Sequence, residues 1–473
     1  VPEDFARGKE VHQDFVDEDF HREPPAGKGS QPAGFTAVPR LDSSDSRGAF
    51  FVQSALNAAL RSSRRGPVHV NWMFREPFTV NDVSSPAYDA LSADAADPPS
   101  ANSIPFTMGD SIDGDDVPDV DPIEIQGNVI IALGGCNADA AQQSTQLARR
   151  LGCPLLADVT SGVRAGSFDI TSQPGLPIPD TIVHLGGRIV SKAWWKWTGE
   201  LDTAQTSLLH VTPTGQTINP HGRDIRKLHC PLRDLDSLVV HAGGNSDFAD
   251  VWTTAIARRD RAIHAFMIHE DRISEPAIAF HISQTCPHDM GLFLGNSTPI
   301  RDMDWFGRGG GSLDSATPII RNVAANRGAS GIDGLLATAM GYAEGLQRRV
   351  TAIVGDLSAL HDLNSLSLVA KSRWPMVIVI INNHAGHIFD LLPIRKSKHF
   401  EQFFATPHQI QFQHAAEMFG IDYTRVSQLQ AFRDAYSAAI GSDRTTVLEV
   451  LTDRQINVEV RREIHDEIEQ CRD

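Results

Sequence analysis

Two stretches, TAIVGD at residues 351–356 and PMVIVIINN at residues 375–383, decide the fold of this 473-residue chain. Each is an apolar run that ends in a polar pair, Gly-Asp in the first and Asn-Asn in the second. We predict that both runs are buried strands and that a helix over about 360–370 connects them. A right-handed crossover makes two such strands parallel, so both polar pairs would emerge at the carboxyl edge of one sheet. Ligands of open α/β sheets bind at that edge.

The polar pairs have the chemistry of a metal–diphosphate site. Asp356 supplies a carboxylate and Asn383 an amide oxygen, which are ligands that Mg²⁺ takes together with phosphate oxygens. Gly355 lets the backbone approach a diphosphate, and the peptide N–H groups that follow it can bind phosphate oxygens. Either pair alone is an ordinary turn or strand end. Their order and spacing together favour the functional interpretation.

Composition excludes several classes of protein. The formal net charge of −17 disfavours binding to nucleic acid or to an anionic membrane surface. The longest apolar run, residues 376–381, is too short to span a membrane. The five cysteines form no C-x-x-C pair, which indicates a reducing compartment and argues against a structural zinc site.

The chain divides into four stretches. Residues 1–80 begin with a segment of disordered composition and end with a strand, and residues 81–121 form an acidic linker or insertion. Residues 122–275 and 276–473 are expected to be two α/β domains, each with a parallel sheet flanked by helices. In the first of these, a helix is expected over 138–151, and strands near 128–133, 154–157, 181–185, 206–211 and 237–240.

The Gly-Asp and Asn-Asn pairs resemble the motif of thiamine-diphosphate enzymes. Four segments around them resemble the 2-succinyl-5-enolpyruvyl-6-hydroxy-3-cyclohexene-1-carboxylate (SEPHCHC) synthases of menaquinone and phylloquinone biosynthesis: 295–301, 326–334, 355–358 and 388–393. The resemblance implies the thiamine-diphosphate-enzyme fold, with 122–275 as its central domain and 276–473 as its diphosphate-binding domain. Residues 66–77 resemble the end of the family's pyrimidine-binding domain, of which 1–80 would hold only a remnant.

The resemblance also implies a set of binding residues. Asp356, Asn383 and the carbonyl of Ala385 would hold Mg²⁺ or Mn²⁺. Substrate carboxylates would be bound by Ser297, Arg301, Arg327 and Lys192. Thiamine diphosphate would contact Gly355, Asp356, Leu357, Ser358, Ile332, Asn383, Ile388 and Phe389, with Ile332 supporting the bent shape of the cofactor.

The activity that follows from the resemblance is a decarboxylating carboligation. The enzyme, a transferase, would decarboxylate 2-oxoglutarate and add the succinyl-semialdehyde unit to isochorismate, giving SEPHCHC and CO₂. A homodimer or tetramer is expected, or a part of a larger fused polypeptide. The location would be the cytoplasm of a bacterium or the plastid of a photosynthetic eukaryote.

The chain departs from the family in three places. The family activates the cofactor with a glutamate of its first domain, and no glutamate here has a matching context, so no catalytic residue is assigned. Ala193 stands where the family usually has an arginine after the lysine. The segment NNHAGH at 382–387 replaces the more usual NNNGGQ, although Ala385 still offers a carbonyl.

Three other functions remain open on the sequence. The chain could be a different thiamine-diphosphate lyase, related to acetolactate synthase or benzoylformate decarboxylase. It could bind the cofactor as a catalytically incomplete fragment or a partner-dependent subunit. A nucleotide site at the Leu-Gly-Gly of 133–135 is the weakest alternative, because the G-x-G-x-x-G pattern is absent.

Overall fold

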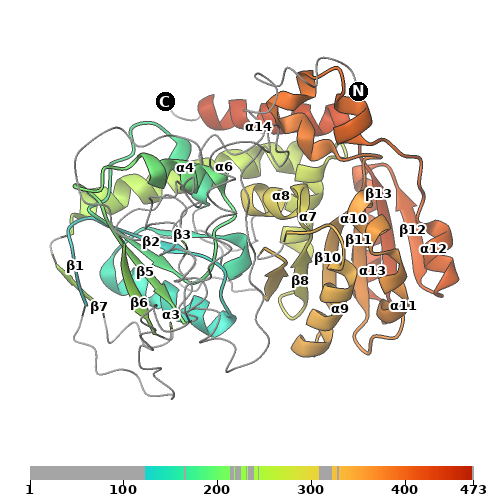
Figure 1. Ribbon diagram of the computed structural model, residues 1–473, viewed down its shortest axis with the longest axis horizontal. Coiled ribbons are helices and arrows are strands. Elements are labelled where there is room, and N and C mark those ends of the chain that lie inside the picture. Colours follow the sequence, from blue (N-terminus) through green and yellow to red (C-terminus); the bar gives the residue numbers. More distant parts are fainter. Residues whose placement is uncertain are drawn as a thin grey trace, which may run out of the picture. The chain divides into compact units, whose positions relative to one another are not determined.

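Parallel sheets organise the part of the chain described by a computed structural model. That part comprises residues 123–163, 167–213, 218, 225–230, 232, 239–242, 244–307, 322–327 and 330–470. Within it lie a six-stranded, a five-stranded and a two-stranded sheet, in which all paired strands are parallel (Figure 1). The expectations for residues 1–80 and 81–121 lie outside the described residues.

The six-stranded sheet contains the two stretches that decide the fold. Its order is β12-β13-β11-β10-β8-β9. The strands are β8 (Gly291–Leu294), β9 (Val323–Ala325), β10 (Val350–Gly355), β11 (Met376–Asn382), β12 (Asp422–Val426) and β13 (Thr446–Leu451). β10 pairs with β11 from Val350 opposite Met376 to Gly355 opposite Ile381. The predicted neighbouring parallel strands are therefore confirmed.

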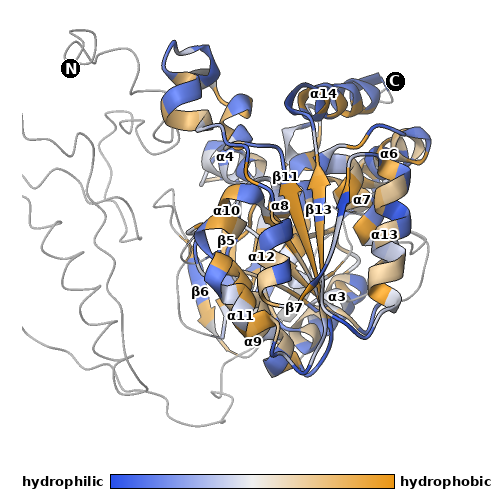
Figure 2. Ribbon diagram, turned by 90° about the vertical axis from the view of Figure 1, so that its right-hand side faces the viewer, coloured by the Kyte–Doolittle hydropathy of each residue, from blue (hydrophilic) through white to orange (hydrophobic). Residues whose placement is uncertain are grey.

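Alternation along the strands fills two cores. Ile353 and Val379 pack on one face against helices α7 (Glu275–Thr285), α8 (Thr298–Phe306), α13 (Leu429–Gly441) and α14 (Arg454–Gln470). Ala352 and Ile378 pack on the other face against α9 (Leu335–Leu346), α11 (Leu366–Val369) and α12 (Gln413–Met418). Because helices cover both faces, the inner strands are mostly apolar, as Figure 2 shows for β11, and Glu449 in β13 is an exception.

The crossover between β10 and β11 differs from the expected single helix over 360–370. Helix α10 (Asp356–His361) begins at the aspartate itself, and a 3₁₀ turn at Leu363–Ser365 separates it from α11. Asp362 interrupts the helix because its carboxylate accepts hydrogen bonds from the backbone of Leu336 and from the hydroxyl of Ser365. The early start places Asp356 in the first turn of a helix, where peptide N–H groups are exposed.

The five-stranded sheet has the order β3-β2-β4-β5-β6. Its strands are β2 (Val129–Leu133), β3 (Leu155–Ala157), β4 (Thr181–Leu185), β5 (Ser207–Thr212) and β6 (Arg226–His229). Helices α3 (Ala138–Leu151), α4 (Lys192–Glu200) and α6 (Ser246–His269) accompany it. None of the described helices combines the length and the apolar character that a membrane span requires.

One strand prediction in this region is wrong. The strand expected at 237–240 was assigned to the central sheet, but β7 (Val239–Ala242) pairs with β1 (Ile123–Gln126) in a separate two-stranded sheet. An apolar run identifies a strand without identifying its partner, because the pairing depends on contacts between distant parts of the chain.

Two methionines provide a test of the core assignment. Met376 is fully buried at the start of β11, whereas Met418, the last residue of α12, is 78% exposed. We expect Met376→Ala to lower the free energy of unfolding by about 2–5 kcal/mol, because it leaves a cavity between strand and helix. Met418→Ala should change it by no more than about 0.5 kcal/mol. Equal losses in urea-induced unfolding would contradict the assignment.

Candidate functional site

The candidate site lies at the carboxyl edge of the six-stranded sheet. The strand order β11-β10-β8-β9 makes the loops after these four strands neighbours. The segments that follow these strands carry Asn383, Asp356, Ser297 and Arg327 respectively. The structure thus brings together at one edge residues that lie up to 86 positions apart in the sequence.

Asp356 presents a buried carboxylate that the protein satisfies only in part. Its Oδ1 accepts a hydrogen bond of 2.7 Å from the backbone of Leu357. Its Oδ2 lies 3.3 Å from Nε2 of His408 but makes no hydrogen bond of acceptable geometry. Burial raises the pKa of Asp356 to about 7, with a smaller contribution from the charge of Glu275. A cation at Oδ2 would compensate this buried oxygen.

The space beside Asp356 can admit a ligand. A Cβ added at Gly355 would meet no protein atom within 4 Å. Ser358 is buried in the first turn of α10, and Leu357 is half-buried. These positions lie at a helix start next to open space, where peptide N–H groups other than that of Leu357 can face a phosphate.

Each of the two asparagines after β11 is held between a buried carboxylate and the backbone. Nδ2 of Asn382 donates to Oε1 of Glu449 at 2.7 Å, and its Oδ1 accepts from the N–H of His384. Nδ2 of Asn383 donates to Oε1 of Glu275 at 2.9 Å, and its Oδ1 accepts from the N–H of Ala385. The side chains therefore fix a tight turn in which Ala385 is buried.

Backbone strain accompanies this edge of the sheet. His384 has φ of 65° and Ser297 has φ of 74°, both in the region that favours glycine. Neither residue is a glycine, so the surrounding contacts must hold these conformations. Such strain is frequent where a loop presents groups to a ligand.

The two carboxylates that hold the asparagines were not predicted. Glu449 lies in the middle of β13, is fully buried, and also accepts from the backbone of Phe412 and the hydroxyl of Tyr423. A charged residue inside the apolar run TVLEVL was a usable signal for it. Glu275 is the first residue of α7, where an acidic residue is common, so its role could not be recognised from the sequence.

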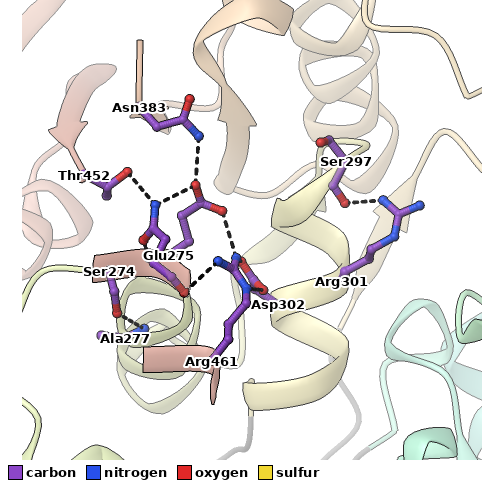
Figure 3. A network of polar contacts seen from close by, with 10 residues as sticks. Ser274, Glu275, Ala277, Ser297, Arg301, Asp302, Asn383, Thr452 and Arg461 are labelled. Carbon is purple, nitrogen blue, oxygen red and sulfur yellow. Dashed lines mark hydrogen bonds and ion pairs between the residues drawn. The ribbon is translucent and has the colours of Figure 1, made fainter. Parts of the chain in front are cut away.

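Glu275 belongs to a network drawn from three helices (Figure 3). Its Oε2 accepts from Nη2 of Arg461 in α14 at 2.9 Å. Arg461 also binds both carboxylate oxygens of Asp302 in α8, with contacts of 3.2 and 2.5 Å. Burial raises the pKa of Asp302 to about 7 despite the charge of Arg461, and Glu275 adds to the rise.

Positive charges gather where β8 and β9 end, with Arg301 in the first turn of α8 and Arg327 in the loop after β9. Nη1 of Arg301 donates to the carbonyl of Ser297 at 2.5 Å, and Nη1 of Arg327 donates to Oδ1 of Asn296 at 3.2 Å. Burial lowers the pKa of both arginines. Arg327 further lowers that of Arg301, and Arg188 further lowers that of Arg327. The mutual repulsion of these guanidinium groups favours an anion beside them.

Arg188 is a residue that the sequence interpretation missed. It follows Gly186 and Gly187 at the carboxyl end of β4 and is exposed. Gly186 has a φ of 79°, and a Cβ there would lie 2.9 Å from the carbonyl oxygen of Gly135, so this position requires glycine. The predicted Lys192 is exposed at the start of α4.

Two buried histidines support the loop that carries Arg188. Nε2 of His184 lies 3.0 Å from the carbonyl of Gly187, and Nε2 of His210 lies 3.1 Å from that of Gly186. Burial lowers the pKa of His184 to about 3, and His210 contributes to the decrease. Both rings are therefore neutral at physiological pH.

Apolar side chains lie near the same edge. Ile332 is 40% exposed, unusual for an isoleucine, and Ile388 and Phe389 are half-buried. Phe389 meets Phe404 edge-on, with ring centroids 5.9 Å apart. Because burial is incomplete, part of each of these three predicted side chains is accessible to a ligand.

In the described part of the chain, side chains alone do not form a complete metal-binding cluster at this edge. Among the described residues, no three His, Cys, Asp or Glu side chains gather as a metal site. The available donors are one carboxylate, one amide oxygen and a backbone carbonyl. This set suits Mg²⁺ or Mn²⁺ that shares its coordination with phosphate oxygens.

Models of two domain families match the chain. The model described as "Middle domain of thiamine pyrophosphate" matches residues 119–294. The model described as "Thiamine pyrophosphate enzyme, C-terminal TPP binding domain" matches residues 318–450. With the parallel sheets flanked by helices, these matches confirm the predicted thiamine-diphosphate-enzyme fold.

Several similar proteins carry the same description, SEPHCHC synthase. The relative from Salinibacter ruber is 33% identical over 442 residues, which cover 88% of this chain and 71% of the relative. The relative from Rubrobacter xylanophilus is 32% identical, and the match covers 86% of this chain and 72% of the relative. The relative from Chlorobium phaeovibrioides is 33% identical, and the match covers 91% of this chain and 74% of the relative.

The similarity to a solved structure is weaker than the similarity to these relatives. It concerns an X-ray structure of a protein isolated from Mycobacterium smegmatis and described provisionally as a thiamin diphosphate-dependent enzyme. The match has a TM-score of 0.47 and 18% identity and covers 69% of this chain and 62% of the other. It carries no argument about the fold.

The buried side chain of His184 provides a test based on the pH dependence of stability. Its pKa is about 3 in the folded chain and about 6.5 when exposed, so its contribution to stability is complete above pH 6.5 and decreases as the pH falls toward 3. Between pH 7 and pH 5 the loss should be about 2 kcal/mol. His184→Gln should remove that part of the pH dependence of the free energy of unfolding in urea. His465→Gln, at a side chain 72% exposed, is the control. An unchanged pH dependence in His184→Gln would show that the folded chain tolerates protonation of this ring.

Proposed function

Because this chain belongs to the SEPHCHC synthase family, we propose that it decarboxylates 2-oxoglutarate and adds the succinyl-semialdehyde unit to isochorismate, giving SEPHCHC and CO₂. The observation that carries the proposal is the carboxylate oxygen of Asp356 that lacks a hydrogen bond. It lies at the edge of the sheet that also carries Asn383 and the arginines. The chemistry of that edge matches what the reaction needs to bind.

The residues present fit thiamine diphosphate with Mg²⁺ or Mn²⁺. Asp356, Oδ1 of Asn383 and the carbonyl of Ala385 would hold the metal, and the first turn of α10 would receive the diphosphate at Gly355. Ile332, Ile388 and Phe389 would form an apolar wall. When bound, the cofactor supplies the electron sink for decarboxylation and carbon–carbon bond formation.

The arginines would hold the carboxylates of the two anionic substrates. Arg301 and Arg327 carry guanidinium groups that can bind a carboxylate through two parallel hydrogen bonds. Arg301 is already oriented by its bond to the carbonyl of Ser297. Lys192 would add charge, and Arg188 would provide the guanidinium that Ala193 lacks. An anion among these groups would relieve their repulsion.

No residue of the chain is assigned to the proton relay that activates the cofactor. A homodimer or a tetramer also belongs to the proposal, but its chains would be identical, so it would not supply the unassigned glutamate. A chain that binds the cofactor without turnover is the second candidate, and it rests on the absence of an assigned glutamate. Release of CO₂ distinguishes the two candidates.

The direct test combines cofactor binding with turnover. We expect the purified chain to bind thiamine diphosphate with Mg²⁺ by calorimetry and to release CO₂ from 2-oxoglutarate, with carbon transfer to isochorismate.

Asp356→Asn should abolish binding because it removes the only carboxylate among the proposed metal ligands. Asp422→Asn, on the exposed end of β12, should retain binding. Binding without CO₂ release would favour the second candidate, and equal binding by Asp356→Asn would contradict the site.

Arginine geometry at the substrate site can be tested by Arg327→Lys. Lysine keeps the charge and loses the fork of donors, so the KM for at least one of the two substrates should rise about tenfold or more. Arg444→Lys, at an arginine 67% exposed, is the control and should leave both KM values unchanged. Unchanged KM values for both substrates in Arg327→Lys would remove this residue from the substrate site.

A further inference from the structure

The side-chain amide of Asn383 is held by a carboxylate from a distant part of the chain. Its Nδ2 donates to Oε1 of Glu275 at 2.9 Å, and the side chain of Glu275 is 2% exposed. Its Oδ1 accepts from the N–H of Ala385 at 3.2 Å. In Figure 3 the amide nitrogen of Asn383 faces Glu275 and the oxygen faces away from it.

This contact determines the orientation of the amide. A half-turn of an asparagine amide exchanges oxygen and nitrogen with almost no change of shape, so packing alone does not select one orientation. An ionised carboxylate only accepts hydrogen bonds, and therefore only the nitrogen can face Glu275. The reversed amide would set its oxygen against Oε1 of Glu275 and its NH₂ group against the N–H of Ala385, so both hydrogen bonds of the side chain would be lost.

Glu275 is itself fixed in position. Its Oε1 also accepts from Nδ2 of Asn457 at 3.0 Å, and the N–H of Glu275 donates to Oδ1 of the same asparagine at 2.8 Å. Its Oε2 pairs with Arg461, which in turn pairs with Asp302. Three helices, α7, α8 and α14, thus hold the carboxylate rigidly, with Arg461 as its counter-charge.

We propose that Glu275 is a positioning residue that fixes the amide of Asn383 so that the oxygen is presented to the metal–diphosphate site. The inference rests on the proposed function, because it takes Asn383 as a metal ligand. Groups that hydrogen-bond to the ligands of a metal orient them and strengthen metal binding. A purely structural role, in which Glu275 only connects the three helices, would give stability without an effect on the metal.

Mn²⁺ binding by the full chain with saturating thiamine diphosphate, measured by electron paramagnetic resonance, separates the two roles. In Glu275→Gln, the new amide should turn its oxygen to Arg461 and its NH₂ group to Asn383. That contact favours the reversed amide of Asn383, so Mn²⁺ affinity should fall about 10- to 100-fold. Asp302→Asn, which disturbs the same network on the far side of Arg461, should leave Mn²⁺ affinity unchanged at a comparable loss of thermal stability.

The double variant provides a readout that a structural role would not produce. Asn383→Asp sets a second carboxylate against Glu275, and Glu275→Gln then supplies the missing donor. Glu275→Gln should therefore weaken Mn²⁺ binding in the otherwise unmodified chain and strengthen it in the Asn383→Asp background. This reversal of sign is expected only if the two side chains act as an oriented pair.

Each contradictory result has its own meaning. Equal Mn²⁺ affinity of the Glu275→Gln variant and the unmodified chain, or the same sign of effect in both backgrounds, would overturn the positioning role alone. Absence of Mn²⁺ binding by the unmodified chain with thiamine diphosphate would overturn the proposed function, and the positioning role with it.

Discussion

Two buried carboxylates hold the asparagine pair at the end of β11, and the candidate site depends on this constraint. Glu449 fixes Asn382 from the neighbouring strand, and Glu275 fixes Asn383 from helix α7. An ionised group inside a protein is unfavourable unless hydrogen bonds or an opposite charge compensate it. Here Arg461 and the asparagine amides provide that compensation. The same hydrogen bonds hold each asparagine side chain in one orientation.

The groups that would bind ligands, in contrast, are only partly compensated by the protein. Asp356 has a carboxylate oxygen without a hydrogen bond, and the charges of Arg301 and Arg327 repel each other, with Asp302 and Asp158 as partial acidic compensation. These groups are held in unfavourable surroundings that a metal and anionic substrates would relieve. The chain has a formal net charge of −17, so this local excess of positive charge is a property of the sheet edge rather than of the whole protein.

The sequence predicted the strands and the ligand pairs because both depend on local patterns. Apolar runs closed by Gly-Asp and Asn-Asn identified β10 and β11 and the edge where Asp356 and Asn383 lie. It did not predict the pairing of β7, the start of α10 at Asp356, or the roles of Glu275 and Arg188. These features depend on contacts between residues far apart in the chain. A single sequence contains the side chains but does not show which distant residues meet.

The most direct measurement is anomalous diffraction from crystals of the chain grown with thiamine diphosphate and Mn²⁺. The expected result is one strong anomalous peak in coordination contact with a carboxylate oxygen of Asp356, Oδ1 of Asn383 and the carbonyl oxygen of Ala385. The nitrogen of Asn383 should still face Glu275. A manganese ion bound elsewhere, or no bound ion at this edge of the sheet, would contradict the central claim that this edge is a metal–diphosphate site.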